Sequence, residues 1–193
     1  MKKSNIFTVP FRRKRTGRTN YRKRLSLLKG NCPRAVVRKS LRNIIVQLIT
    51  FEPRGDKVVL HADSKELQKY GWLMGCGNIP AAYLTGYLLG TRAKKRDITK
   101  ATLDIGINVS TKGGRLYAAL KGMLDAGINI PHNEECLPDN ARVLGQHIEN
   151  YANLLQQAQN KRQFSQSFKA GINMKELEQC VSRTKQRLAK EGI

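Results

Sequence analysis

The sequence predicts an α/β fold, in which helices pack on a mixed sheet made of an antiparallel three-strand meander plus one further strand. Residues 34–63 contain three Val- and Ile-rich segments separated by short turn-prone connections. After residue 78 the hydrophobic period becomes that of helices, and a strand, helix, strand, helix order is typical of helices layered on a sheet. We expect three parts: a basic arm at 1–30, an α/β core domain at 31–131 and a helical C-terminal extension at 132–193.

The arm contains one short helix. Thr19 or Asn20 is placed to cap it, and Gly30 and Pro33 stop it. Pro10 and the dense positive charge that follows it argue against a helix further upstream. The apolar residues of the helix are Leu25, Leu27 and Leu28.

The meander follows the arm. Its predicted strands are RAVVRKS, NIIVQLITF and DKVVLHAD, joined by KSLRN and EPRGD. Connections as short as these imply antiparallel pairing, and Pro53 with Gly55 suits a tight reversal. The middle strand is apolar on almost every position of both faces. We therefore expect a central strand that is covered by protein on both sides, or by protein on one side and a partner on the other.

A long helix begins after the meander. Asn78 is its expected cap, Pro80 lies in its first turn, and cations cluster where it ends. Gly86 and Gly90 indicate close packing of this helix on the sheet. The segment KATLDIGI is a short strand, which can join the sheet in parallel only through the crossover helix. A further helix is expected from Gly114 to Asp125.

The C-terminal extension is helical. One helix is expected behind Asp139 or Asn140, with its apolar residues at helical spacing. A Gln- and Ser-rich linker covers residues 156–171, and a last helix starts with an Asn173 and Glu176 capping box. The two apolar stripes comprise Leu144, Ile148, Tyr151 and Leu155, then Met174, Leu177, Val181, Thr184 and Leu188.

The net charge of +22 is concentrated at the N-terminus, because fifteen Lys or Arg precede the first acid, Glu52. Like charge at this density repels itself, so its presence points to an acidic partner. The alternative is a solvated tail with no specific partner.

No arrangement of residues indicates an active site, a cofactor or a metal. STKGGR places its Lys before the glycines, unlike a phosphate-binding loop, and GWLMGCGN does not fit a dinucleotide motif. Asp104 is expected to form a turn, and no second carboxylate is spaced to assist it. The histidines are isolated and the cysteines are widely separated, so neither has the spacing of a metal site, and we expect the cysteines to be reduced, partly buried thiols. These residues are His61, His132, His147, Cys32, Cys76, Cys136 and Cys180.

A nucleic acid is the expected partner of the arm. The segment FRRKRTGRTNYRKR is richer in Arg than in Lys, and guanidinium groups bind phosphate in bidentate fashion. It lacks the apolar stripe of a membrane-surface helix, and neither a recognition helix nor a zinc module for DNA is visible. Phe11 and Tyr21 either stack on unpaired bases or fasten the arm to its own domain. Structured RNA is therefore favoured, and we expect neither membrane nor DNA as a partner.

Several blocks of the chain, over about residues 9–148, resemble the archaeal and eukaryotic branch of the large-subunit ribosomal protein eighteen family, whose eukaryotic members are called protein five. The resemblance rests on VPFRRKRTGRTNYRKRL, RAVVRKSLRNIIVQLITFEPRGD, KYGWLMGCGNIPAAYLTGYLLG, LDIG, STKGGRLYAALKGMLDAGINIPH and RVLGQHI. The length is closer to the archaeal form.

This resemblance implies a non-enzymatic protein of the cytoplasmic ribosome. It would bind 5S rRNA and anchor it to 23S rRNA in the central protuberance, beside neighbouring proteins including the ribosomal protein five family of bacterial nomenclature. The rival hypotheses are an RNA-modifying enzyme and a membrane-surface adaptor. The implied RNA contacts are Phe11, Arg12, Arg13, Lys14, Arg15, Arg18, Thr19, Asn20, Tyr21, Arg22, Lys23, Arg24, Lys39, Ser40, Arg42, Thr111, Lys112 and Arg115. Relatives usually have Asn in place of Leu41.

Overall fold

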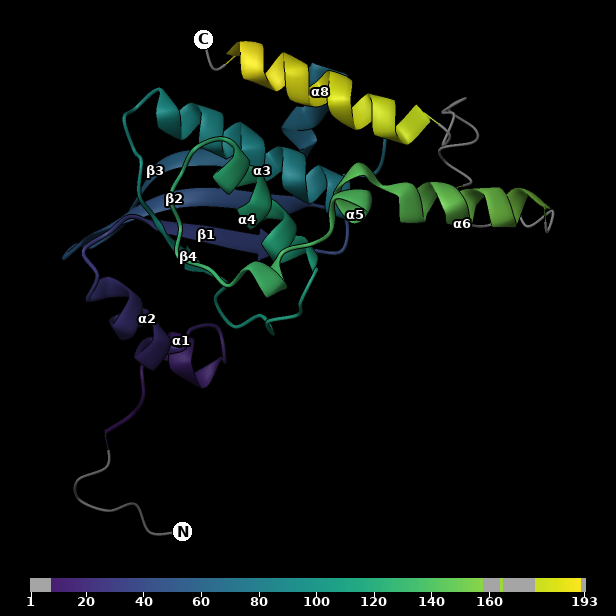
Figure 1. Cartoon of the computed structure of the whole chain (residues 1–193). Coiled ribbons are helices and arrows are strands. Elements are labelled where there is room, and N and C mark those ends of the chain that lie inside the picture. The colour runs from purple at the N-terminus through teal and green to yellow at the C-terminus, as the bar shows by residue number, and fades with distance from the viewer. Residues whose placement is uncertain (1–7, 158–163, 165–175, 192–193) are drawn as a thin grey trace, which may run out of the picture.

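The computed structural model describes residues 8–157, 164 and 176–191, and its centre is a four-stranded sheet (Figure 1). The order of the strands is β3-β2-β1-β4, with β1 antiparallel to β2 and β2 antiparallel to β3. β4 pairs in parallel with β1. The predicted mixed sheet is therefore confirmed. The strands are β1 (Arg34–Lys39), β2 (Ile44–Glu52), β3 (Gly55–Asp63) and β4 (Thr102–Asp104).

Helix α3 (Ile79–Lys94) is the crossover from β3 to β4, and α4 (Arg115–Asp125) packs against it. The Asn78 side chain accepts a hydrogen bond from Ala81 N at 2.8 Å, as expected of a cap. The prediction that the glycines of α3 pack on the sheet was wrong. A Cβ at Gly86 would overlap the backbone of Ala119, so its missing side chain lets α3 and α4 approach almost to backbone contact.

The core lies between the sheet and these helices. Inward residues of β1 and β2, such as Ala35 and Val46, are fully buried, as is Trp72, whose indole N–H donates to Gly75 O. The outer face of the sheet is partly covered as well, since Val36 and Ile49 are buried there. β2 is thus central in the sheet, buried on its inner face and only partly covered on its outer face, where Phe51 is 55% exposed.

The N-terminal arm leaves the sheet on the side opposite α3 (Figure 1). It contains α1 (Arg12–Arg15) and α2 (Tyr21–Leu28). Asn20 caps α2 by accepting hydrogen bonds from Arg22 N and Lys23 N, both at 3.1 Å. The expectation that no helix forms upstream of α2 was wrong. α1 forms a single helical turn there, in which the Phe11 carbonyl accepts hydrogen bonds from the backbone N–H groups of Lys14 and Arg15.

Two short 3₁₀ helices were not predicted from the sequence, η1 (Ser64–Tyr70) and η2 (Glu134–Cys136). η1 starts with a capping box in which the Asp63 side chain accepts from the backbone and Glu66 reaches back to Asp63 N. Arg92 of α3 then pairs with Glu66 at 2.7 Å, so this turn is tied to the crossover helix.

The helix predicted behind Asp139 is divided in two, α5 (Asn140–Leu144) and α6 (Gln146–Gln157). Gly145 separates them with a φ of +88°, and a Cβ there would overlap Leu177. The apolar stripe predicted for this helix is only partly buried, because Tyr151 is 43% exposed.

The last helix, α8 (Leu177–Glu191), packs on α3, as Figure 1 shows. Its stripe of Leu177, Val181, Thr184 and Leu188 is buried as predicted. Asn173 and Met174, which were expected to begin this helix, lie outside the described residues, as does most of the predicted linker. Within the described ranges, no helix has both the length and the apolar character needed to cross a membrane.

Candidate nucleic-acid interface

A groove of about 610 Å³ runs between the arm and the outer face of the sheet. Cations from both sides line it: Arg13, Arg18 and Lys23 from the arm, and Arg38 from β1. The loop that follows β4 forms one end, with Gly106 and Asn108 in the wall. Cationic walls focus positive potential in the groove and attract anions, so this groove suits a polyanion.

Ion pairs hold the arm to the sheet. The two terminal nitrogens of Arg24 each lie 2.7 Å from an Asp56 carboxylate oxygen, which is a bidentate pair between α2 and β3. Asp56 also lies 2.8 Å from Nη2 of Arg34, as an ion pair and not as a well-aligned hydrogen bond. Arg34 is 3% exposed and donates from Nη1 to Asp104 at 2.8 Å. Two acids thus neutralise two arginines beneath the arm.

This chain of charges shifts two pKa values. Partial burial alone would raise the pKa of the Asp56 carboxyl, but the hydrogen bonds from Arg24 and the positive charges of Arg24 and Arg34 outweigh burial and lower that pKa. The hydrogen bond to Asp56 raises the pKa of the Arg24 guanidinium. Both shifts favour the charged forms, so the pair stays ionised at neutral pH.

Other arm residues hold the arm in shape. Thr19 Oγ1 accepts from Arg13 Nε at 2.8 Å, and the Asn20 side chain is used in the cap of α2. The rings of Phe11 and Tyr21 pack on each other with centroids 5.3 Å apart. Phe11 nevertheless remains 71% exposed.

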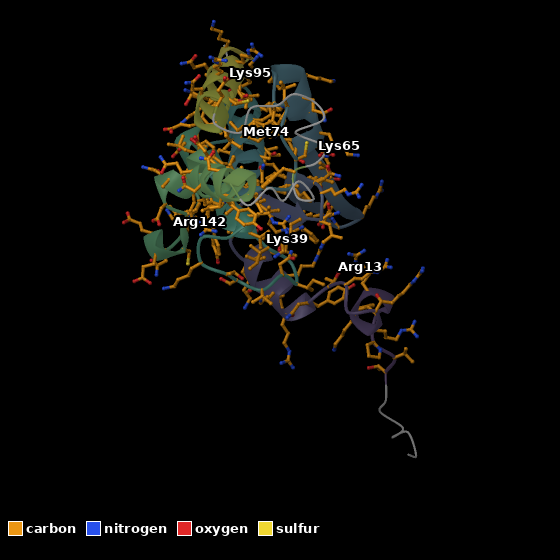
Figure 2. The ribbon with its side chains drawn as sticks, turned by 90° about the vertical axis from the view of Figure 1, so that its right-hand side faces the viewer. Arg13, Lys39, Lys65, Met74, Lys95 and Arg142 are labelled. Atoms are coloured by element: carbon orange, nitrogen blue, oxygen red, sulfur yellow. The ribbon has the colours of Figure 1, made fainter. Side chains whose placement is uncertain are left out.

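A set of arm cations is exposed and has no side-chain partner among the described residues. These cations stand on α1, on the turn after it and at the start of α2, and Figure 2 shows Arg13 in the same segment, below the body of the protein. Because the described acids near the arm are already paired with Arg24 and Arg34, no residue that the structure describes neutralises this charge. The set is Arg12, Lys14, Arg15, Arg18, Arg22 and Lys23.

The structure joins the other two predicted contact segments. Arg115, at the start of α4, donates from Nη1 to Ser40 O at 3.0 Å and to Gly77 O at 2.9 Å. The Ser40 hydroxyl closes the β1–β2 turn by donating to Asn43 O. Lys39 and Arg42 flank this turn and are exposed. Arg115 therefore holds the β1–β2 turn, on which Lys39 and Arg42 lie, through its hydrogen bond to Ser40 O.

The remaining predicted contacts lie before α4. Thr111 is exposed, and its carbonyl accepts from Gly114 N. Lys112 pairs with Glu135 at 2.8 Å, but both side chains are about 70% exposed, 72% and 69%. Such an exposed pair contributes little, roughly 0–1 kcal/mol, so it leaves Lys112 able to exchange partners.

Sequence reasoning missed the outer-face arginines, Arg34 and Arg38, and the ion pairs of the two acids beneath the arm, Asp56 and Asp104. The only signal was Asp104 at the end of a strand, expected as a turn former. It does accept from Gly106 N at 2.8 Å, and it also binds Arg34. No cluster of metal ligands occurs in the part of the chain that the structure describes. Of the four free cysteines, Cys32 is exposed, unlike the partly buried state expected for all of them.

Comparisons with known proteins show which family this chain resembles. Residues 5–99 and 91–133 match the family described as "Ribosomal large subunit proteins 60S L5, and 50S L18". The large ribosomal subunit protein uL18 of Korarchaeum cryptofilum is 51% identical over 190 residues, covering 98% of this chain and 97% of the relative. The protein of the same name from Methanococcus maripaludis is 46% identical over 184 residues, covering 94% and 95%.

Proposed function

Because this chain belongs to the uL18 family of large-subunit ribosomal proteins, we propose that it binds 5S rRNA and anchors it to 23S rRNA in the central protuberance. Membership of the family makes the chain a ribosome-bound structural protein and not an enzyme. The proposal extends this to the particular RNAs, to a cytoplasmic location, and to contact with neighbouring subunit proteins, including the ribosomal protein five family of bacterial nomenclature.

The observation that carries the proposal is the unequal pairing of the arm cations. Arg24 is neutralised by Asp56, whereas the exposed set from Arg12 to Lys23 has no acidic partner among the described residues. RNA phosphates would supply the missing negative charge and release counterions on binding. The groove beside the arm gives an RNA strand a defined path along β1.

The predicted contact residues divide into two roles under this proposal. The exposed cations of the arm, together with Lys39, Arg42 and Lys112, would bind phosphates directly. Phe11 and Tyr21 would offer ring faces to unpaired bases. Arg24, Asn20 and Thr19 would hold the arm in place, while Arg115 and Ser40 would hold the β1–β2 turn, so these five act mainly through the residues they position.

Salt-dependent binding to a 5S rRNA transcript tests the proposal. The full chain should bind the transcript at near-physiological salt, and its affinity should fall steeply as salt rises. Lys14→Ala should weaken binding and reduce the salt slope by about one, the loss expected for one phosphate contact.

Lys95→Ala is the matched control, because Lys95 is also an exposed Lys and lies at the opposite end of the molecule from the arm (Figure 2). Lys95→Ala should leave the affinity for the transcript and the salt slope near those of the unaltered chain. Equal binding to 5S rRNA and to an unrelated RNA of the same length, or equal effects of the two substitutions, would refute the proposal.

A further inference from the structure

Two carboxylates line the groove beside the arm, although the other charged residues of its lining are cations. They belong to Asp56 of β3 and Asp104 of β4, whose side chains are 25% and 15% exposed. An unpaired carboxylate in this position would repel a phosphate backbone. The presence of two acids here therefore indicates a role in holding the groove together.

Arg34 of β1 lies between the two acids and is 3% exposed. Its Nη1 donates to Asp104 at 2.8 Å, and its Nη2 lies 2.8 Å from an oxygen of Asp56. Its Nε has no hydrogen-bond partner among the described residues. One buried cation thus joins carboxylates on β3 and β4, the two edge strands of the sheet.

Asp56 connects Arg34 to the first wall of the groove, which is the arm. The Asp56 carboxylate accepts two hydrogen bonds of 2.7 Å from Arg24 of α2. The cations of this wall lie on α1, on the turn after it and on α2. A displacement of Asp56 would therefore change where these cations lie.

Asp104 connects Arg34 to the second wall, which is the loop 105–108 that follows β4. Oδ2 of Asp104 accepts from Arg34, while its Oδ1 accepts from Gly106 N at 2.8 Å. Ile107 of this loop is 61% exposed in the lining of the groove. A single carboxylate thus ties the second wall to the same buried guanidinium.

We propose that Arg34 is a positioning residue for RNA binding, which sets the arm and the loop 105–108 at the spacing that an RNA strand needs. It does so through Asp56 and Asp104, and it neutralises both acids so that they do not repel the strand. The proposal rests on the proposed function, because it assumes that the groove binds RNA. Since Arg34 is buried, it acts through the residues that it holds and not by contact with the strand.

The chemistry of this position requires an arginine. A planar guanidinium presents separate nitrogens to two different acids, whereas a Lys ammonium is a single point charge. Arg34→Lys therefore keeps the positive charge but loses one of the two ties. Walls that are already in place also spare the RNA the cost of ordering them during binding.

Nuclear magnetic resonance relaxation of the backbone amides, measured on the full chain without RNA, tests the two ties. Arg34→Lys should increase the mobility of both α2 and the loop 105–108. Asp56→Asn should act mainly on α2, and Asp104→Asn mainly on the loop. Unchanged signals from β2 and α3 show that each variant is folded. If α2 and the loop both keep their mobility in folded Arg34→Lys, the residue does not position the walls.

The affinity for the 5S rRNA transcript is the sharper test, because charge and position predict opposite results for one variant. Asp104→Asn removes a negative charge from the groove, so charge alone predicts tighter binding. If the tie to the loop sets the groove, binding should instead weaken, by about threefold. Arg34→Lys, in which the net charge is unchanged, should weaken binding by about fivefold.

Arg142→Lys is the matched control. It makes the same exchange at an exposed position of α5 that does not line the groove, and Figure 2 places Arg142 on the body of the protein, away from Arg13. It should leave the affinity and the mobility of both walls unchanged. Tighter binding by Asp104→Asn, or unchanged binding by Arg34→Lys, would overturn the proposal.

Failure of this proposal can be distinguished from failure of the proposed function. If the unaltered chain does not bind the transcript, the proposed function falls and the role of Arg34 falls with it. If the unaltered chain binds and Arg34→Lys binds equally well, only the positioning role falls.

Discussion

Arg24 on the N-terminal arm and Asp56 on β3 form two parallel hydrogen bonds of 2.7 Å, although 32 residues separate them in sequence. Arg34 lies against the same carboxylate from β1. One acid thus joins the arm to two strands of the sheet. This contact orients the unpaired cations of the arm, and it gives the arm a position that a purely flexible tail would lack.

Replacement of Arg24 by Lys should loosen the arm while keeping its charge. A Lys ammonium cannot form the bidentate pair, so we expect faster amide hydrogen exchange in α2 and a loss of about 1 kcal/mol in arm attachment. Arg22→Lys is the matched control, because Arg22 is exposed on the same helix and has no described partner. If both variants exchange alike, the ion pair does not hold the arm.

The attachment of the arm to the sheet should weaken at acidic pH, where Asp56 becomes protonated. The pKa of Asp56 is lower in the folded protein than the ordinary Asp value of 3.8. A carboxyl with a depressed pKa stabilises the folded state fully above the ordinary value, and this stabilisation is lost as the pH falls through the lower folded value. The protection of the α2 amides, measured relative to their intrinsic exchange rates at each pH, should therefore fall below pH 3.8.

Asp56→Asn removes the titrating group and supplies the control for this pH effect. In that variant the arm should already exchange fast at neutral pH, with no further step at acidic pH. If the variant still lost protection to the same extent at acidic pH, another carboxyl would be responsible for the effect. Glu66 is the candidate, because partial burial raises its pKa but the hydrogen bond and charge of Arg92 outweigh burial and lower it.

Gly86→Ala should destabilise the protein, although Ala favours helix formation over Gly by about 1 kcal/mol. The new Cβ would overlap the backbone of Ala119 on α4, and a backbone cannot move aside as a flexible side chain can. Overpacking of this kind costs roughly 1–3 kcal/mol in the free energy of unfolding. Urea unfolding measures it, and Gly75→Ala, where a Cβ meets open space, should be nearly neutral. A more stable Gly86→Ala variant would contradict the close helix crossing.

Tyr83→Phe should weaken the docking of α8. The Tyr83 hydroxyl donates to Asp125 at 2.6 Å and accepts from Lys185 of α8 at 2.6 Å, and Lys185 also lies over the ring. Burial and Asp125 raise the pKa of the Tyr83 hydroxyl, so it remains a donor. Because Asp125 and Lys185 are each about 40% exposed, 39% and 40%, we expect a loss of only about 1 kcal/mol.

Tyr87→Phe is the control for the hydroxyl. The ring of Tyr87 also lies near Lys185, at 5.2 Å, but its hydroxyl has no partner among the described residues. Amide exchange in α8 should rise in the Tyr83 variant and stay unchanged in the Tyr87 variant. Equal exchange in the two would mean that the rings, and not the Tyr83 hydroxyl, hold the helix.

Local chemistry made several elements predictable from the sequence. Asn20 and Asn78 cap their helices with side chains that reach backbone N–H groups two or three residues away, so the neighbouring sequence is sufficient to identify them. The buried stripe of α8 follows from helical spacing in the same way. The excess of cations in the arm is a property of composition, and it pointed to RNA without any coordinates.

Contacts between distant segments were decided only by the tertiary structure. Nothing near Arg24 in the sequence identifies Asp56 as its partner, and nothing near Gly86 shows that it faces α4. The meeting of Arg42 with His147 and Tyr151 at one cavity depends on how the β1–β2 turn and α6 pack. The physical reason is the separation in sequence of the residues involved. Helix caps and apolar stripes join residues within one or two helical turns, whereas these ion pairs and cavities join segments that only the folded core brings together.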